Sequence, residues 1–352
     1  MKTRHTCLLA LCLLMAALAP NALHAAESKQ TLDEALEAVQ TMDYGDSWKP
    51  VYAVRQAVRA STSSPDRQDA LQRRLLDLLQ SPDSSYMCAK LVCHNWLPVV
   101  GDEKAVPVLR DMLDGGKRAP LAVEALAEIP GEKSTAALRR AARETDGDAR
   151  VMAVQALGER RDADALDLLA ELSGSEDADL REAARHAIAR VGTGRSFELL
   201  MSADDVAPEA LHTLASRRLQ EGNAEQAAEI AEMLTRADRP VHVRRAGLSV
   251  MAKMDSARAV PALLETVGSD DRALAAHALR LCLDHHPDAA REDIAETLDE
   301  LPAERRALAL DYIGRLGDSS WANVAARHLD DGPAHVRTAA MGALGRIGGA
   351  SH

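Results

Sequence analysis

Metal-binding side chains are concentrated in one stretch of the sequence. The stretch contains His277, Cys282, Asp284, His285 and His286. Imidazole and thiolate groups are the ligands that zinc and copper prefer, and residues four apart in a helix share a face. Pro287 would end such a helix directly after His286, and no second ligand pair stands at a standard spacing. We therefore predict that His285 and His286 lie at an exposed helix end, with a metal-binding module around residues 277–286 as the alternative.

A second group of side chains could carry thiol chemistry. Cys93 and His94 are adjacent, Trp96 is close by, and Cys88 lies five residues before Cys93. A thiol here could attach a chromophore, but Cys93 stands where most of the repeats described below have alanine, which predicts a buried structural thiol. Cys88 is nearer the expected helix start, where we expect greater exposure. Side chains five apart on a helix point to different sides, so we predict no disulfide between Cys88 and Cys93.

Sequence signatures of catalysis are missing. The chain has no G-x-S-x-G, no H-E-x-x-H, no phosphate-binding glycine loop and no S-x-x-K. Carboxylates are plentiful, but paired-acid catalysis needs a pocket that shifts their pKa values, and no motif indicates one. We therefore predict that the protein is not an enzyme, with no catalytic residue, no cofactor site and no metal site.

The bulk composition narrows the class of binding partner. The formal net charge is −12, and only 2% of the residues are aromatic. Phosphate binding needs a dense cationic face, and single strands need aromatic stacking platforms. The composition therefore argues against nucleic acid and leaves a protein as the expected partner. A core of small aliphatic side chains suits closely packed helices.

Internal repetition is the main feature of the sequence. A basic residue is followed three positions later by a small residue, and four positions after that by a large aliphatic one. Neighbouring copies lie 28 to 34 residues apart. The first position holds Lys90, Ala119, Arg150, Arg181, His212, Arg244, Arg272, Arg306 and Arg337. The small position holds Cys93, Ala122, Ala153, Ala184, Ala215, Gly247, Ala275, Ala309 and Ala340, and the large position holds Leu97, Leu126, Leu157, Ile188, Leu219, Met251, Leu279, Ile313 and Leu344. Offsets of three and seven share a helix face, so the small residue should let a neighbouring helix approach.

A second amphipathic helix follows each of these helices. Examples are residues 103–113, 162–172 and 257–267, and Gly192 and Gly222 are among the expected turn residues. Each unit is then a helical hairpin that cannot bury its faces alone, so the hairpins must stack. The sequence predicts an all-α fold, a right-handed α-α superhelix of about eight to nine hairpins preceded by N-terminal helices.

The basic positions would form a ladder along one edge of this stack, since packed helices lie roughly 10 Å apart. Such a ladder could bind anions or carboxylates. Alternatively, each arginine pairs with a loop carboxylate such as Asp148, Asp179 or Asp271 and fixes the loop. We favour this structural interpretation because acidic residues are abundant.

The three tryptophans are scattered along the chain. Trp96 is next to a large position and is predicted to lie in the core. Trp48 and Trp321 stand at expected helix starts, where we predict partial exposure. Either could anchor a partner, because aromatic residues are enriched at binding hot spots.

The VRxxAxxALG and GDxxAVPxLxxML patterns resemble the HEAT repeats named after phycobiliprotein (bilin) lyases. The resemblance is clearest over residues 90–113, 148–172 and 336–349, and it covers roughly 86–352. Residues 31–85 resemble the segment that precedes such repeats in some secreted bacterial HEAT proteins. The resemblance implies a HEAT-like solenoid used as a binding or scaffolding surface, and in a minority of members a role with a bilin chromophore.

The N-terminus has the features of a signal peptide. Lys2 and Arg4 precede an apolar run over residues 7–19, which is too short for a permanent membrane span, and cleavage is expected near Ala25 or Ala26. We divide the chain into a signal peptide (1–26), an N-terminal helical segment (27–85) and a repeat solenoid (86–352) whose last repeat is incomplete. The protein would then be exported, and periplasmic or secreted.

These features together predict a non-catalytic scaffold or adaptor in an extracytoplasmic compartment. It would bind a protein partner on the solenoid surface, along the inner curve of the superhelix or at an exposed C-terminal edge. Two alternatives stay open. One is a chromophore-handling protein like the bilin lyases, and the other is the metal-binding module around His277 and His286. The sequence leaves the oligomeric state open.

Overall fold

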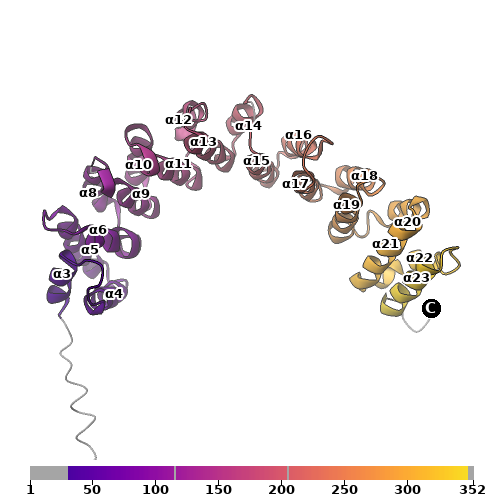
Figure 1. The fold of residues 1–352 in the computed structure, drawn as a ribbon, viewed down its shortest axis with the longest axis horizontal. Helices are drawn as coiled ribbons and strands as arrows, with labels where there is room; N and C mark the ends of the chain where they lie inside the picture. Colours follow the sequence, from indigo (N-terminus) through magenta and orange to yellow (C-terminus); the bar gives the residue numbers. More distant parts are fainter. Residues whose placement is uncertain (1–30, 115, 204–205, 348–352) are drawn as a thin grey trace, which may run out of the picture. The chain divides into compact units, whose positions relative to one another are not determined.

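The protein is described here by a computed structural model covering residues 31–114, 116–203 and 206–347. Every regular element in these residues is a helix, and none is a strand (Figure 1). The predicted all-α solenoid of stacked hairpins is confirmed. The predicted signal peptide lies outside the described residues. Contacts between residues divide the chain into two compact units, and the boundary between Ala153 and Val154 falls inside α11 (Gly147–Glu159).

The first unit begins with three helices and continues with two hairpins. Its elements are α3 (Leu32–Gln40), α4 (Lys49–Ser61), α5 (Pro65–Gln80), α6 (Tyr86–Leu91), the π-helix η1 (Val92–Trp96), α7 (Leu97–Val100), η2 (Glu103–Ala105), α8 (Val106–Leu113), η3 (Gly116–Arg118), α9 (Ala119–Glu128) and α10 (Glu132–Glu144). The helices α6, η1 and α7 follow one another without a break, and the π-helix ends two residues before Pro98. Together they form the first helix of a hairpin whose second helix is α8.

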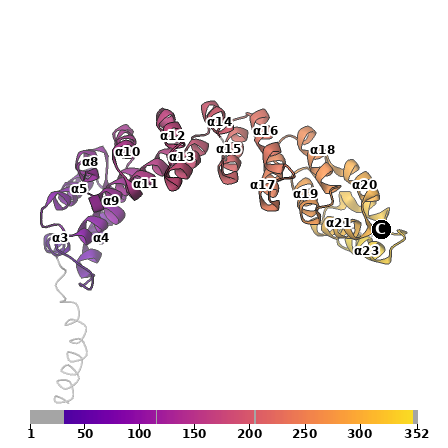
Figure 2. The same cartoon turned by 45° about the horizontal axis from the view of Figure 1, so that its top comes forward.

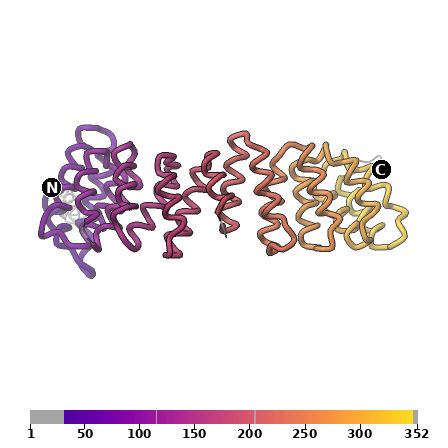
Figure 3. The backbone as a smooth tube through the Cα atoms, turned by 90° about the horizontal axis from the view of Figure 1, so that it is seen from above, coloured from indigo at the N-terminus to yellow at the C-terminus, as the bar shows by residue number. Residues whose placement is uncertain are grey.

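The second unit continues the same alternation. Its elements are η4 (Ala163–Ala165), α12 (Leu166–Leu172), α13 (Ala178–Val191), α14 (Gly194–Met201), α15 (Pro208–Gln220), α16 (Ala224–Thr235), α17 (Val241–Met251), α18 (Ser256–Val267), α19 (Arg272–His285), α20 (Arg291–Glu300), α21 (Ala303–Leu316), η5 (Ser319–Trp321), α22 (Ala322–Ala326) and α23 (Ala334–Ile347). Figure 2 shows the odd-numbered helices from α13 to α19 in one row and the even-numbered helices in a second row. Consecutive members of the first row pack against each other, as α13 does with α15 and α21 with α23. In Figure 3 the successive hairpins of this unit lie side by side.

The repeated sequence positions form the core. Every residue of the small position is buried, and most of the large position is too, with Leu219 and Leu344 half-buried. Gly247 explains why the small position must be small. A Cβ atom there would lie 2.8 Å from the Ala231 carbonyl oxygen of α16, so a side chain would force the two helices of this region apart.

The register of α19 differs from the prediction. Arg272 was placed in the basic position, but its side chain is 79% exposed. Counting from Ala275 restores a spacing of 31 residues from Arg244 and of 31 to Arg306. The small and large positions of α19 are then Ala278 and Cys282, both 0% exposed. The prediction was wrong by three residues because a basic residue was required at the first position, where this helix has alanine.

None of the helices in the described part of the chain combines the length and the apolarity that crossing a membrane would require.

Candidate functional site

The arginines of the basic position are bonded to backbone carbonyls of the preceding helix or of the turn after it. Arg150 Nε donates to the Ala142 carbonyl at 2.9 Å, and Arg244 Nε donates to the Thr235 carbonyl at 3.3 Å. Arg181 and Arg337 bond in the same way to turns that follow α12 and α22. The last carbonyls of a helix have no partner within it, so each guanidinium completes the end of the helix before it.

Loop carboxylates are the second partner of this row. Arg244 lies 3.5 Å from Asp271, as predicted, whereas the bonds of Arg150 and Arg181 go to carbonyls instead of Asp148 or Asp179. The main contacts of these arginines therefore hold the ends of helices and the turns that follow them. This is the structural role that we favoured from the sequence.

Arg306 has the densest set of these bonds. Its guanidinium donates to the carbonyls of Leu298, Asp299 and Leu301 at 2.8 to 2.9 Å. It also donates to Asp331 Oδ2 at 2.5 Å, with both side chains largely buried. The hydrogen bond from Arg306 lowers the pKa of the Asp331 carboxyl below its ordinary value.

The three cysteine thiols that could have attached a chromophore are buried. Cys88, Cys93 and Cys282 are free and fully buried, which confirms the prediction for Cys93 and corrects that for Cys88. Burial raises the pKa of Cys93 and that of Cys282 to about 12 each. A thiolate is the reactive form, so these three positions offer no accessible nucleophile for attaching a chromophore.

The side chains of the histidine cluster have separate hydrogen-bond partners. His286 was predicted to be exposed, but it is buried, with Nε2 2.9 Å from the Ala252 carbonyl and Nδ1 3.0 Å from Ser256 Oγ. His277 is buried beside Ser249 and Arg280, and Asp284 accepts a hydrogen bond from Tyr312. Among the described residues, no three His, Cys, Asp or Glu side chains come together as a metal site would need.

The burial of the three tryptophans agrees with the prediction at Trp96 and Trp48 and differs from it at Trp321. Trp96 is in the core, as predicted, but Trp321 is 0% exposed and packs near the Arg291 guanidinium. Trp321 lies in η5, directly before α22 (Ala322–Ala326). Trp48 is 50% exposed, which confirms the prediction for this residue.

Trp48 is one of three exposed aromatic residues in the loop before α4 and its first turn, Tyr44, Trp48 and Tyr52, which we name together the N-terminal aromatic surface. Their exposed fractions are 77%, 50% and 53%. Trp48 directly precedes α4 and Tyr52 lies one turn later, with the Tyr52 N–H bonded to the Trp48 carbonyl at 3.1 Å. Residues four apart in this arrangement share a helix face. Arg55 stacks over the Tyr52 ring, 4.9 Å from its centroid.

The loop that carries Tyr44 is held in place by its own side chains. The Asp43 N–H donates to Asp46 Oδ2 at 2.8 Å, and the Tyr44 N–H donates to Asp43 Oδ1 at 2.7 Å. Gly45 has a φ of 100°, which favours glycine. Ser85 Oγ donates to the Met42 carbonyl at 2.7 Å and brings the start of α6 to this loop. Tyr86, the next residue, is 48% exposed.

Sequence reasoning found only one member of this surface. The available signal was the distribution of aromatic residues, since Tyr44, Trp48, Tyr52 and Tyr86 are half of the three Trp, four Tyr and one Phe in the chain. Aromatic side chains bury a large apolar area when they enter a core. This chain has few aromatic residues and leaves four of them at the surface. Their exposure therefore indicates a surface that contacts another molecule.

Comparison with known proteins gives a match over part of the chain. Residues 119–189 match the family of HEAT repeats, and no curated protein matches the chain. Among solved structures, an engineered protein is 17% identical with a TM-score of 0.38, over 89% of this chain and 98% of its own. Kap121p is 8% identical with a TM-score of 0.47, over 90% of this chain and 45% of its own. Human deoxyhypusine hydroxylase in complex with glycerol is 15% identical with a TM-score of 0.29, over 93% of this chain and 99% of its own.

These structural likenesses assign no activity to this chain. The sequence match falls on α9 to α13, where the basic, small and large positions recur at 31 residues. The match to HEAT repeats therefore concerns residues 119–189, which are part of an all-helical solenoid of stacked hairpins.

Proposed function

We propose that this protein is a non-catalytic scaffold or adaptor of an extracytoplasmic compartment, which binds a protein partner through the N-terminal aromatic surface. The observation that carries the proposal is the exposure of Tyr44, Trp48 and Tyr52 on an ordered loop and helix start. Trp and Tyr side chains dominate binding hot spots, because they bury much area at a small cost in side-chain entropy. The inner curve of the superhelix stays a prediction as a second binding surface.

Several observations are consistent with a binding role rather than a catalytic one. The conspicuous arginines are bonded to helix ends, and the thiols of residues 88, 93 and 282 are buried. The surface charge is acidic, which disfavours nucleic acid as the partner. None of the described residues offers the accessible thiol that the chromophore-handling alternative requires.

The test is affinity purification from the envelope fraction at native expression, read by quantitative mass spectrometry. The wild type is compared with the double variant Trp48→Ala, Tyr52→Ala. A matched control replaces Val241 and Met341, which are 42% and 56% exposed elsewhere in the chain, by alanine. A partner should be recovered with the wild type and the control, and at least about tenfold less with the aromatic variant, which corresponds to about 1.4 kcal/mol or more. Equal recovery with all three proteins would sink the proposed surface.

Export is tested separately, because the signal segment lies outside the described residues. Cell fractionation should place the protein in the periplasmic or extracellular fraction. Sequencing of its N-terminus should begin at Ala26 or Glu27, the residues that follow the two expected cleavage positions. Recovery of the full-length chain from the cytoplasmic fraction would contradict the proposed location.

A further inference from the structure

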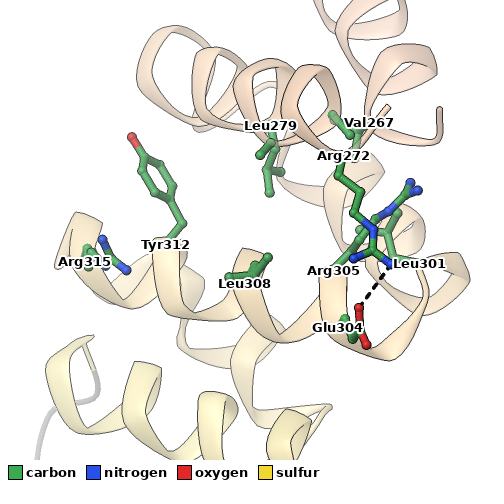
Figure 4. Close-up of a pocket in the computed structure, with 11 residues that line it drawn as sticks. Val267, Arg272, Leu279, Leu301, Glu304, Arg305, Leu308, Tyr312 and Arg315 are labelled. Atoms are coloured by element: carbon green, nitrogen blue, oxygen red, sulfur yellow. Dashed lines mark ion pairs between the residues drawn. The ribbon is translucent and has the colours of Figure 1, made fainter. Parts of the chain in front are cut away.

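The second unit contains an apolar groove between α19 and α21. Its volume is about 240 Å³, and its apolar lining includes Ala276, Leu279, Leu301 and Leu308. Figure 4 shows Leu279 and Leu308 at the middle, Tyr312 and Arg315 toward one end, and Arg272, Glu304 and Arg305 toward the other. The groove follows α21 from residue 304 to residue 315, which is about 16 Å along a helix axis.

The groove forms where the residues at one helix-crossing position of the repeat are larger than elsewhere. Where α11 meets α13, a Cβ on Gly158 would lie 2.6 Å from the Cα of Ala187, and the same holds for Gly314 and Ala343 between α21 and α23. In both pairs the glycine follows the large position and the alanine precedes it. The corresponding residues of α19 and α21 are Leu283 and Tyr312. Two large side chains therefore stand where a glycine and an alanine let helices touch.

These two residues are fixed in the structure. Leu283 is 1% exposed, and the Tyr312 hydroxyl donates to Asp284 Oδ1 of α19 at 2.8 Å. Burial and this hydrogen bond raise the pKa of Tyr312 to about 12, so the hydroxyl stays protonated as a donor. The groove is thus held open by packed side chains that also tie its two walls together.

The edges of the groove carry three arginines, and each of them already has a carboxylate partner. Arg272 pairs with Glu304, Arg305 lies 4.0 Å from Asp270, and Arg315 is bonded to Asp311. Arg272 and Glu304 are 79% and 72% exposed, and an exposed ion pair of this kind contributes little. Arg315 is 66% exposed, and a guanidinium has five N–H donors, so an incoming carboxylate can replace Glu304 on Arg272 and share Arg315 with Asp311.

We propose that this groove binds one face of an amphipathic helix of a partner protein, whose apolar residues fill the groove and whose flanking acidic residues meet Arg272 and Arg315. Helices dock in such grooves through apolar residues spaced three or four apart. The Leu308 side chain is 67% exposed on the groove wall. A small ligand that fills only the groove volume of about 240 Å³ would leave this side chain in contact with water, so we infer a larger occupant, a protein. This inference rests on the proposed scaffold function and adds the chemistry of a partner.

The test uses two synthetic helical peptides in fluorescence anisotropy titrations with the full chain. Both carry leucines at every third or fourth position, one flanked by glutamates and the other by lysines. The wild type should bind the glutamate peptide at least about tenfold more tightly than the lysine peptide, with a strong dependence on salt. Leu308→Gln should weaken binding at least about tenfold, and the double variant Arg272→Glu, Arg315→Glu should reverse the preference between the peptides.

The control is Met341→Gln, at a residue that is 56% exposed outside the groove lining, and it should bind like the wild type. Equal binding of both peptides, or binding unaffected by Leu308→Gln, overturns the proposal. Saturable binding of dodecanoate in place of the peptides overturns it in favour of a small amphiphile. A dimer in sedimentation that Leu308→Gln dissociates overturns it in favour of a second copy. Recovery of a partner through Trp48 would leave the scaffold function standing in each of these cases.

Discussion

At the residue scale, the arginines of the repeat act as caps for the helix ends that precede them. A guanidinium offers five N–H donors in a fixed plane and has no acceptor. Arg306 uses this geometry to satisfy the carbonyls of Leu298, Asp299 and Leu301 and the Asp331 carboxylate together. A lysine could not reach this set, because its ammonium is a single point charge at the end of a flexible stem.

We expect Arg306→Met to destabilise the end of the second unit. The substitution keeps the apolar stem but removes the hydrogen bonds to three carbonyls and to the Asp331 carboxylate, which should cost about 2–4 kcal/mol in local unfolding free energy. Native-state hydrogen exchange over α20 to α23 measures this cost. Arg272→Met is the matched control, since that side chain is 79% exposed, and it should change exchange by less than about 0.5 kcal/mol. Equal effects would refute the capping role.

The Arg306–Asp331 pair should make the stability of this region depend on pH. The pKa of Asp331 is lowered in the folded protein, so its contribution is present above the unfolded value of about 3.9 and is lost as pH falls through it toward the folded value. Asp331→Asn should therefore lower the thermal midpoint at pH 7, and this deficit should shrink at pH 3. Calorimetry at the two pH values compares the proteins. A deficit that persists or grows in acid would contradict the expected sign.

The sequence predicted which arginines have a structural role better than it predicted the atoms that they contact. Arginine three residues before most of the small residues implied a structural role, and Arg150, Arg181, Arg244, Arg306 and Arg337 have one, since each bonds to a backbone carbonyl. Their acceptors were assigned to Asp148 and Asp179 because side chains can be read from a sequence, whereas the free carbonyls of a helix end cannot. His286 was misplaced for a similar reason, since its partners are the Ala252 carbonyl and Ser256 in the hairpin before it.

At the element scale, the distance between neighbouring hairpins is set by a few side chains at the helix crossing. Gly314 meets Ala343 with no room for a Cβ, whereas Gly345, the same position one repeat later, has no described atom within 4 Å of its Cβ site. The two glycines are equivalent in sequence and different in surroundings. They therefore separate the cost of a close approach from the cost of glycine in a helix.

We expect opposite effects from alanine at these two glycines. Gly314→Ala should force α21 and α23 apart and destabilise the protein by about 1–3 kcal/mol. Gly345→Ala should be neutral or stabilise it by up to about 1 kcal/mol, because alanine favours helix and meets nothing there. Urea unfolding followed by circular dichroism gives both values. If Gly314→Ala is as stable as Gly345→Ala, the crossing does not depend on a missing Cβ.

The elements themselves were largely predictable, and their register less so. The second helices at residues 103–113 and 257–267 appear as η2 with α8 and as α18, within a residue of the prediction. The predicted register was wrong at α19, because Arg272 was assigned to the basic position, which Ala275 occupies in the structure. The groove could not be foreseen, because Leu283 and Tyr312 become a pair only once the helices are aligned in space.

At the scale of the whole molecule, a stacked-hairpin protein has contacts that are mostly local in sequence. Each hairpin packs on its neighbours, as α17 does on α15 and α19, so stability is approximately a sum of hairpin and neighbour contributions. The N-terminal aromatic surface lies in the first unit and the groove in the second. A partner that binds one of them would therefore stabilise mainly the hairpins around it.

The buried cysteines allow this locality to be measured, because Cys88 and Cys93 lie in the first unit and Cys282 in the second. A thiol that is fully buried, with its pKa raised by burial, reacts with a maleimide only when its surroundings open. In Arg306→Met, labelling of Cys282 resolved by mass spectrometry should accelerate by about tenfold or more. The lost bonds join α21 to the end of α20, the second helix of the hairpin that contains Cys282. Labelling of Cys88 and Cys93 should keep its wild-type rate. Equal acceleration at all three cysteines would mean that the chain opens as one cooperative body, and the additive description of the hairpins would then fail.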